Sequence, residues 1–280
     1  MTNIFDDYKK QKDFLVCVDS DGCAIDTMTI KHEKCFGPCM VEEWNLEQWE
    51  EDILNRWNEV NLYTITRGIN RFQGLAKALE EVNEKYTKIE DIDKLLNWVS
   101  EAKELSTRAL ENEMKQNPSC IFEKAISWSN KVNESINNLT FEEKQPFKEV
   151  KESLAYIHQF ADIAIVSSAN LQAVEEEWTE HGLLDYVDIV LAQEAGTKSI
   201  CIEKLLKEGY DKDKVIMLGD AKGDLDAAEK NGVLYFPILV RNENKSWKEF
   251  VEQGLKNVID GKYRGTYQQE KIEQFLSNLS

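Results

Sequence analysis

The sequence has no long apolar run, no export signal and few positive charges. Its hydrophobic stretches are only as long as single β-strands, so no segment is predicted to span a bilayer. Residues 1–13 lack the apolar stretch and the small-residue cleavage site of a secretory signal, and we therefore expect a cytoplasmic protein. The 34 Lys and Arg residues are outnumbered by 52 Asp and Glu residues. The resulting net charge of −18 would repel nucleic-acid phosphates, which argues against a nucleic-acid partner.

The six cysteines form neither a disulfide framework nor a zinc motif. Cys35 and Cys39 are four residues apart, but no second pair stands nearby and no histidine is spaced to complete a zinc site. Free thiols in a reducing compartment are the expected state. The chain of 280 residues also has no internal repeat or low-complexity tract. Its length and composition suit one large globular domain or two smaller ones.

Five short runs rich in Val, Ile and Leu indicate a parallel β-sheet. They are residues 13–19, 162–167, 187–191, 214–219 and 233–239. Because these runs are almost continuously apolar, they are typical of strands that are covered on both faces. Helical patterns lie between them, such as the apolar series Phe147, Val150, Leu154 and Ile157. This alternation predicts an α/β fold with a Rossmann-like parallel sheet.

The middle of the chain, residues 31–145, has a different character. It contains five of the seven tryptophans and only three of the thirteen glycines, and its apolar residues recur at helical spacing. We therefore predict two domains, an α/β core formed by residues 1–30 and 146–280 and an all-helical domain inserted at 31–145. The polar tail 241–280 is expected to pack against the sheet domain.

The first acidic motif, Asp19-Ser20-Asp21-Gly22, directly follows the first predicted strand. Ligands bind parallel sheets beyond the carboxyl ends of the strands. Two carboxylates crowded together there would raise the pKa of one of them. One could then stay ionised as a nucleophile while the other serves as a general acid. A simple turn is the alternative. A calcium loop is excluded, because Met28 stands where such a loop needs glutamate.

Three further groups of polar residues follow later strands. In Gly219-Asp220-Ala221-Lys222-Gly223-Asp224, Asp220 and Asp224 could converge on a magnesium ion. The alternative is that Asp224 is a helix N-cap, and both can hold together. Ser167 and Ser168 could hold a phosphate oxygen, or could simply start a helix. Lys198 precedes a helical run and could equally be a solvated surface charge.

Taken in order, these pieces resemble the haloacid dehalogenase superfamily of phosphotransferases. The resemblance rests on Asp19-x-Asp21-Gly22, Ser167 after an apolar strand, Lys198, and Gly219-Asp220-x-x-x-Asp224. The helical insert after the first strand is similar to the helical cap domain of that family.

The resemblance implies a role for each catalytic residue. Asp19 would attack phosphorus and become an aspartyl phosphate. Asp21 would protonate the leaving oxygen and then deprotonate the water that releases phosphate. Ser167 and the amide of Ser168 would hold a phosphate oxygen, and Lys198 would neutralise charge on the phosphate and the nucleophile.

The resemblance also implies a Mg²⁺ cofactor. Asp19, the main-chain carbonyl of Asp21, and Asp220 would bind the ion, and Asp224 would bind it directly or through water. Mg²⁺ and Lys198 would together supply the local positive charge that an acidic protein needs in order to bind an anionic substrate.

One segment of the helical insert is a candidate for substrate binding. Arg67 and Arg71 are four residues apart, so on a helix they would share a face. Arg67, Asn70 or Arg71 could then contact a second anionic group of the substrate. The alternative is that the two arginines form surface ion pairs with nearby glutamates.

The favoured function is that of a Mg²⁺-dependent phosphatase acting on a small phosphorylated metabolite. Asp21 argues against the dehalogenating relatives, which lack this acid, and against transport ATPases, which carry threonine there. Two alternatives stay open. One is a sugar phosphomutase that uses the same residues, and the other is a binding or regulatory protein that has lost turnover.

Overall fold

The computed structural model describes residue 5 and residues 8–280. Residues 1–4 and 6–7, part of the stretch that lacks a signal-peptide pattern, lie outside the described residues. The chain divides into two compact units, an α/β unit of Met1–Met28 and Lys144–Ser280 and a helical unit of Thr29–Glu143. The predicted limits of the insert, residues 31 and 145, differ from these by two residues.

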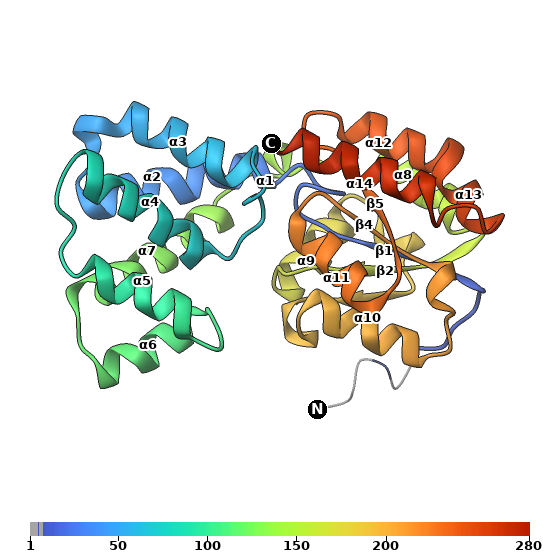
Figure 1. Ribbon diagram of the computed structural model, residues 1–280, viewed down its shortest axis with the longest axis horizontal. Helices are drawn as coiled ribbons and strands as arrows, with labels where there is room; N and C mark the ends of the chain where they lie inside the picture. Colours follow the sequence, from blue (N-terminus) through green and yellow to red (C-terminus); the bar gives the residue numbers. More distant parts are fainter. Residues whose placement is uncertain (1–4, 6–7) are drawn as a thin grey trace. The chain divides into compact units, whose positions relative to one another are not determined.

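The α/β unit is built on a five-stranded sheet (Figure 1). Its strands are β1 (Phe14–Val18), β2 (Ala161–Val166), β3 (Ile189–Leu191), β4 (Val215–Gly219) and β5 (Leu234–Pro237). Their order is β3-β2-β1-β4-β5, and every neighbouring pair is parallel. The sheet confirms the predicted parallel α/β fold. β1 lies at the centre of the sheet, because it pairs with β2 on one side and with β4 on the other. Both of these strands come from much later in the chain.

Helices cover both faces of this sheet. Helices α8 (Val150–Ile157), α12 (Glu243–Glu249) and α13 (Leu255–Ile259) lie on one face, and α10 (Lys198–Lys207) and α11 (Lys222–Asn231) lie on the other (Figure 1). Alternate residues of β1, Val16 and Val18, belong to an apolar cluster with Trp178 of α9 (Leu171–Glu180) and Trp247 of α12. Burial on both faces explains why the strands read as continuous apolar runs.

The tail packs on the α/β unit, which confirms the expectation for residues 241–280. Helix α14 (Thr266–Asn278) lies beside β5, and the Phe275 ring is 5.6 Å from the ring of Tyr235. Phe250 and Tyr263 join the apolar cluster of the sheet.

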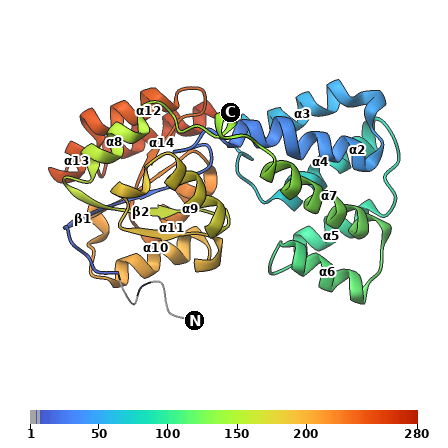
Figure 2. The same ribbon diagram turned by 180° about the vertical axis from the view of Figure 1, so that it is seen from behind.

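The helical unit begins within the short helix α1 (Met28–Lys31). Its longer helices are α2 (Gly37–Trp44), α3 (Glu50–Leu62), α4 (Arg71–Lys85), α5 (Ile92–Glu101), α6 (Thr107–Gln116) and α7 (Cys120–Asn137) (Figure 2). A π-helical turn, His32–Phe36, connects α1 to α2. The core is aromatic: Trp128 is fully buried and makes edge contacts with Trp57 and Phe72. None of the helices in the described part of the chain has the length and hydrophobicity that crossing a bilayer requires.

Candidate active site

The acidic motif Asp19-Ser20-Asp21-Gly22 begins where β1 ends. The amide of Asp19 donates a hydrogen bond of 3.0 Å to the carbonyl of Leu218 on β4. The first residue of the motif therefore continues the hydrogen bonding between β1 and β4. The carbonyl of Ser20 accepts hydrogen bonds from three later amides, those of Cys23, Ala24 and Ile25. Gly22 has φ of 79°, a conformation that glycine adopts without strain. The loop therefore turns tightly over the end of the sheet.

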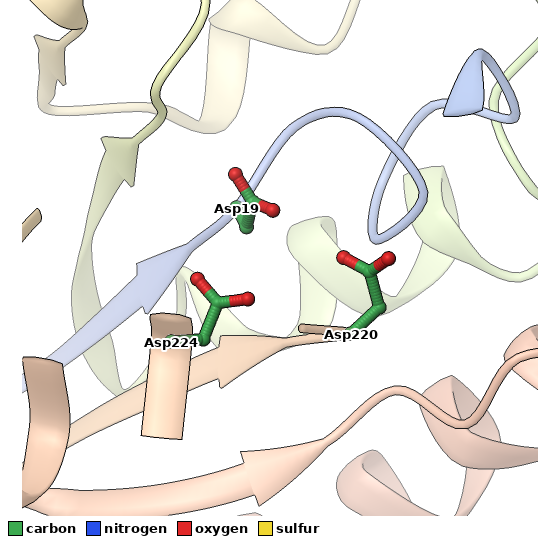
Figure 3. Close-up of side chains that lie close together, drawn as sticks. All are labelled: Asp19, Asp220 and Asp224. Atoms are coloured by element: carbon green, nitrogen blue, oxygen red, sulfur yellow. The ribbon is translucent and has the colours of Figure 1, made fainter. Parts of the chain in front are cut away.

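Three carboxylates meet at this edge of the sheet. Asp19 follows β1, whereas Asp220 and Asp224 follow the neighbouring strand β4, and one oxygen of each lies within 4.8 Å of the others (Figure 3). All three residues are buried. Gly219, just before Asp220, makes this approach possible, because a Cβ there would lie only 2.2 Å from Cγ of Asp224. Gly219 belongs to the acidic motif in the sequence, but nothing in the sequence reveals this steric role.

Lys198, the first residue of α10, supplies a positive charge to the cluster. Its Nζ lies 2.8 Å from Oδ1 of Asp19 and 2.6 Å from Oδ1 of Asp224. Burial by itself would lower the pKa of Lys198, but the two carboxylates outweigh this effect and raise the pKa above its ordinary value. Lys198 is therefore a largely shielded cation within the site, with 12% of its side chain exposed, and the alternative of a solvated surface charge is wrong.

The carboxylates carry more negative charge than Lys198 can balance. Burial raises the pKa of Asp19 well above its usual value, in opposition to Lys198, and the nearby charges of Asp224 and Asp220 raise it further. The pKa of Asp224 is raised in the same way, by burial first and then by Asp220, while Lys198 opposes the shift. One lysine thus faces three buried acids, an arrangement that a bound cation would stabilise.

Asp224 uses both of its oxygens within the protein. Oδ1 accepts the hydrogen bond from Lys198, and Oδ2 accepts one of 3.1 Å from the amide of Ala221, at the start of α11. The N-cap of α11 is Ala221, so the expectation that Asp224 is itself the N-cap is wrong. Asp224 is the third residue of the helix, and its side chain accepts from the N-cap amide while it also belongs to the acidic cluster.

The side chain of Asp21 is half-buried and is not among the three carboxylates that lie within 4.8 Å of one another. The hydroxyl of Thr27, which is fully buried, donates a hydrogen bond to Oδ1 of Asp21. This contact fixes the orientation of the Asp21 carboxyl. Thr27 lies outside the predicted set of site residues, and its position six residues after Asp21 was the only signal for it in the sequence.

Ser167 and Ser168 follow β2, the other neighbour of β1. The register pairs Val18 with Ile165, which places Ser167 beside the loop after β1. Ser167 is buried, and its hydroxyl accepts a hydrogen bond of 3.1 Å from the amide of Ala169. Ser168 is exposed. The N-cap of α9 is Asn170, so neither serine is the cap of that helix.

The three residues predicted to bind substrate belong to the helical unit and have local contacts there. Arg67 is 2% exposed and donates to the carbonyl of Leu62. Asn70 is the N-cap of α4. Because α4 begins at Arg71, the expectation that both arginines share a helix face is wrong. The alternative of surface ion pairs is also wrong for Arg67, since its side chain is buried.

Arg71 has contacts of a different kind. Its Nη1 donates to Oδ1 of Asn133 at 2.7 Å and to Oγ of Ser129 at 3.2 Å, and its guanidinium lies 5.2 Å from the ring of Phe36. Burial lowers the pKa of Arg71. That Arg67, Asn70 or Arg71 contacts the substrate stays a prediction.

Comparisons with known proteins agree with this architecture. The family model of haloacid dehalogenase-like hydrolases matches residues 69–238, and the chain belongs to this family of hydrolases. The predicted family and class of enzyme are thereby confirmed. The match starts just before α4 and ends just after β5, so the Asp19-x-Asp21 motif lies outside it. A comparison with curated protein sequences finds no match.

Several solved structures are similar to this chain at low sequence identity. A Clostridium difficile protein assigned as a phosphatase is 18% identical, with a TM-score of 0.50 over 81% of this chain and 86% of its own. A predicted phosphoglycolate phosphatase from Haemophilus somnus is 14% identical, with a TM-score of 0.46 over 80% and 84%. A Thermotoga maritima protein assigned as a β-phosphoglucomutase is 16% identical, with a TM-score of 0.48 over 80% and 84%.

Proposed function

We propose that this protein is a Mg²⁺-dependent phosphatase that hydrolyses a small phosphomonoester through an aspartyl phosphate. The observation that carries the proposal is that the buried acids Asp19, Asp220 and Asp224 meet Lys198 at the carboxyl ends of β1 and β4. Phosphoryl transfer needs positioning and charge compensation more than unusual reactive groups. This group supplies a carboxylate nucleophile, a cation and a set of hard oxygen donors in one place.

The donor set fits magnesium by its chemistry. Mg²⁺ prefers oxygen ligands and takes one or two carboxylates together with water and phosphate oxygens. Asp19 and Asp220 would hold the ion together with the carbonyl of Asp21. Asp224 would act through water, because both of its oxygens already accept hydrogen bonds. Bound Mg²⁺ would neutralise negative charge on the phosphate group during transfer.

The residues of the chain would act in two half-reactions. In the first, an oxygen of Asp19 bonds to phosphorus as the bond to the leaving alcohol breaks, and Asp21 gives its proton to that alcohol. In the second, Asp21 takes a proton from water, the water oxygen bonds to phosphorus, and Asp19 is released. Lys198 and Ser167 would hold the phosphate oxygens throughout. Splitting the reaction allows one carboxyl group, that of Asp21, to serve as the acid and then as the base.

The helical unit would serve as the cap that selects the substrate. The substrate we expect is a small phosphorylated metabolite in the cytoplasm, where the six free thiols would stay reduced. A phosphomutase would use the same residues but would return the phosphoryl group to its product. Release of free phosphate in the absence of a bisphosphate primer separates the two activities.

The test measures phosphate release from a panel of phosphorylated metabolites, with Mg²⁺ and with EDTA. Wild-type protein is expected to release phosphate only with Mg²⁺. Asp19→Asn is expected to lower the rate by about 10⁴-fold or more, as is typical for loss of a nucleophile, while the protein stays folded. Normal turnover by Asp19→Asn would show that the assigned nucleophile is wrong.

Asp162→Asn is the matched control for this substitution. Asp162 is also a buried acid of the α/β unit, but it lies near the amino end of β2, whereas the candidate site lies at the carboxyl ends of the strands. Its carboxylate accepts hydrogen bonds from the amides of Gln11 and Lys12 and from the hydroxyl of Tyr210. Its replacement is expected to lower stability and to leave turnover per folded molecule unchanged. Absence of Mg²⁺-dependent activity in the wild-type protein would instead favour the binding or regulatory alternative.

A further inference from the structure

Two buried tryptophans donate hydrogen bonds to the loop that follows β1. Nε1 of Trp178, on α9, donates to Oγ of Ser20 at 2.9 Å. Nε1 of Trp247, on α12, donates to the carbonyl of Cys23 at 2.8 Å. Both side chains are fully buried, and so are both of the residues that accept these bonds. Two separate helices of the α/β unit therefore hold the same loop through indole N–H groups.

The two acceptor residues lie on either side of Asp21 in the loop. Ser20 lies between Asp19 and Asp21, the proposed nucleophile and the proposed acid, and its carbonyl accepts the hydrogen bonds that close the loop. Cys23 follows Gly22, whose positive φ turns the chain. A displacement of Ser20 or Cys23 would move the two carboxylates relative to Lys198 and to the incoming phosphate. The tryptophans therefore hold the loop on each side of Asp21.

Packing alone does not account for these contacts. A phenylalanine or leucine could fill much of the same space, whereas an indole adds a polar N–H that must find a partner when it is buried. Both indoles find that partner on the loop, although 158 residues separate Trp178 from Ser20 and 224 separate Trp247 from Cys23.

We propose that Trp178 and Trp247 are positioning residues, which hold the loop from Asp19 to Cys23 so that Asp19 and Asp21 face the phosphate at the required distance and angle. The proposal rests on the proposed function. A misplacement of reacting groups by about 1 Å can cost about 10²-fold in rate. Loss of one of two tethers is therefore expected to cost about tenfold in kcat.

The test replaces each indole by a ring that lacks the donor, in Trp178→Phe and Trp247→Phe. Tyr263→Phe is the matched control, because its hydroxyl is a buried donor to the carbonyl of Tyr235 in the same unit. All three variants are expected to lose about 2–4 °C of melting temperature. Only the two tryptophan variants are expected to lose about tenfold in kcat with KM unchanged, which loss of stability alone would not produce.

A second measurement does not depend on catalysis. Hydrogen exchange of the Ala24 and Ile25 amides, which donate to the carbonyl of Ser20, is expected to become faster in both tryptophan variants and to stay unchanged in Tyr263→Phe. Ser20→Ala removes the acceptor of Trp178. Combining it with Trp178→Phe should therefore cost no more in kcat than either change alone.

The outcomes separate the two proposals. If the tryptophan variants match Tyr263→Phe in kcat and in amide exchange, Trp178 and Trp247 are core residues only and the positioning proposal is overturned. If wild-type protein shows no Mg²⁺-dependent phosphate release, the proposed function fails, and the catalytic role of the tryptophans fails with it. Amide exchange in the same samples still decides whether the indoles hold the loop.

Discussion

The ion pairs of the candidate active site and those of the helical unit lie in opposite environments. In the α/β unit, Lys198 and Asp224 form a pair whose side chains are 12% and 0% exposed. In the helical unit, Arg56 pairs with Glu81 while its side chain is 45% exposed, and Lys131 pairs with Glu42 in a similarly open setting. Exposed pairs contribute little to stability, whereas a buried pair carries a large desolvation cost that its partner must offset.

The two units also differ in the charged groups that they bury together. The core of the helical unit is mainly apolar and aromatic, and its buried tryptophan Trp128 donates to the carbonyl of Phe36, a contact that joins two helices. The α/β unit also has an apolar core, but it buries three acids together beside a lysine whose side chain is 12% exposed. A protein selected for stability alone would have no reason to retain that group, so the contrast itself indicates chemistry in the α/β unit.

The largest expected effect comes from Lys198→Met. It leaves Asp19, Asp220 and Asp224 buried without their cation, which should cost about 3–5 kcal/mol in the free energy of unfolding and at least about 10²–10³-fold in activity. Urea unfolding in EDTA measures the first effect and phosphate release with Mg²⁺ the second. The control, Lys131→Met, removes an exposed cation and should change the free energy of unfolding by less than about 1 kcal/mol. If Lys198→Met and Lys131→Met lowered the free energy of unfolding equally, the contrast between the shielded and the exposed ion pairs would be wrong.

A smaller effect is expected from Gly219→Ala. The added methyl group would meet Asp224 at 2.2 Å, so the carboxylate and Lys198 must shift. We expect a loss of about 10²-fold in kcat and about 1–3 kcal/mol in the free energy of unfolding. Gly223→Ala, four residues later in α11, meets no atom within 4 Å and should instead stabilise the protein by about 0.5–1 kcal/mol. An active Gly219→Ala protein would show that the close approach of Asp224 is unnecessary.

Thr27→Val should have a moderate effect that is confined to turnover. It removes the hydroxyl that donates to Asp21, so the proposed acid loses its fixed orientation. We expect a fall of about tenfold in kcat, with little change in KM. This is less than the ~10²–10⁴-fold that a general acid contributes, because Asp21 itself is still present. Thr27→Ser keeps the hydroxyl and should keep most of the activity. If both variants behaved alike, the hydrogen bond would have no part in catalysis.

The smallest effect is expected in the helical unit. Arg56→Gln breaks the exposed pair with Glu81 and should lower the free energy of unfolding by about 0.2–1 kcal/mol at low salt. The difference should almost vanish in about 1 M salt, where the screening length is near 3 Å. Denaturant titrations at the two salt concentrations measure it. A loss above about 2 kcal/mol would mean that the Arg56–Glu81 pair contributes to stability as much as the shielded Lys198–Asp224 pair, and would contradict the comparison.

Much of the fold could be predicted because its signals are local. The five apolar runs correspond to the five strands, and the shift to helical periodicity after the first of them corresponds to the helical unit. The segment around Arg67 shows the limit of such signals. Spacing alone predicted one helix for Arg67 and Arg71, but Asn70 caps α4 and leaves Arg67 in the preceding turn.

The sequence by itself determined the class of fold, the family and the order of the acidic motifs, since each can be recognised from short local patterns and their order along the chain. Only the tertiary structure decided that Asp19, Asp220, Asp224 and Lys198 meet within a few ångströms. It alone decided that Trp178 and Trp247 donate to the loop between Asp19 and Cys23. The physical reason is that periodicity and turn preference act over a few residues, whereas these contacts join segments brought together only by the packing of the sheet and its helices.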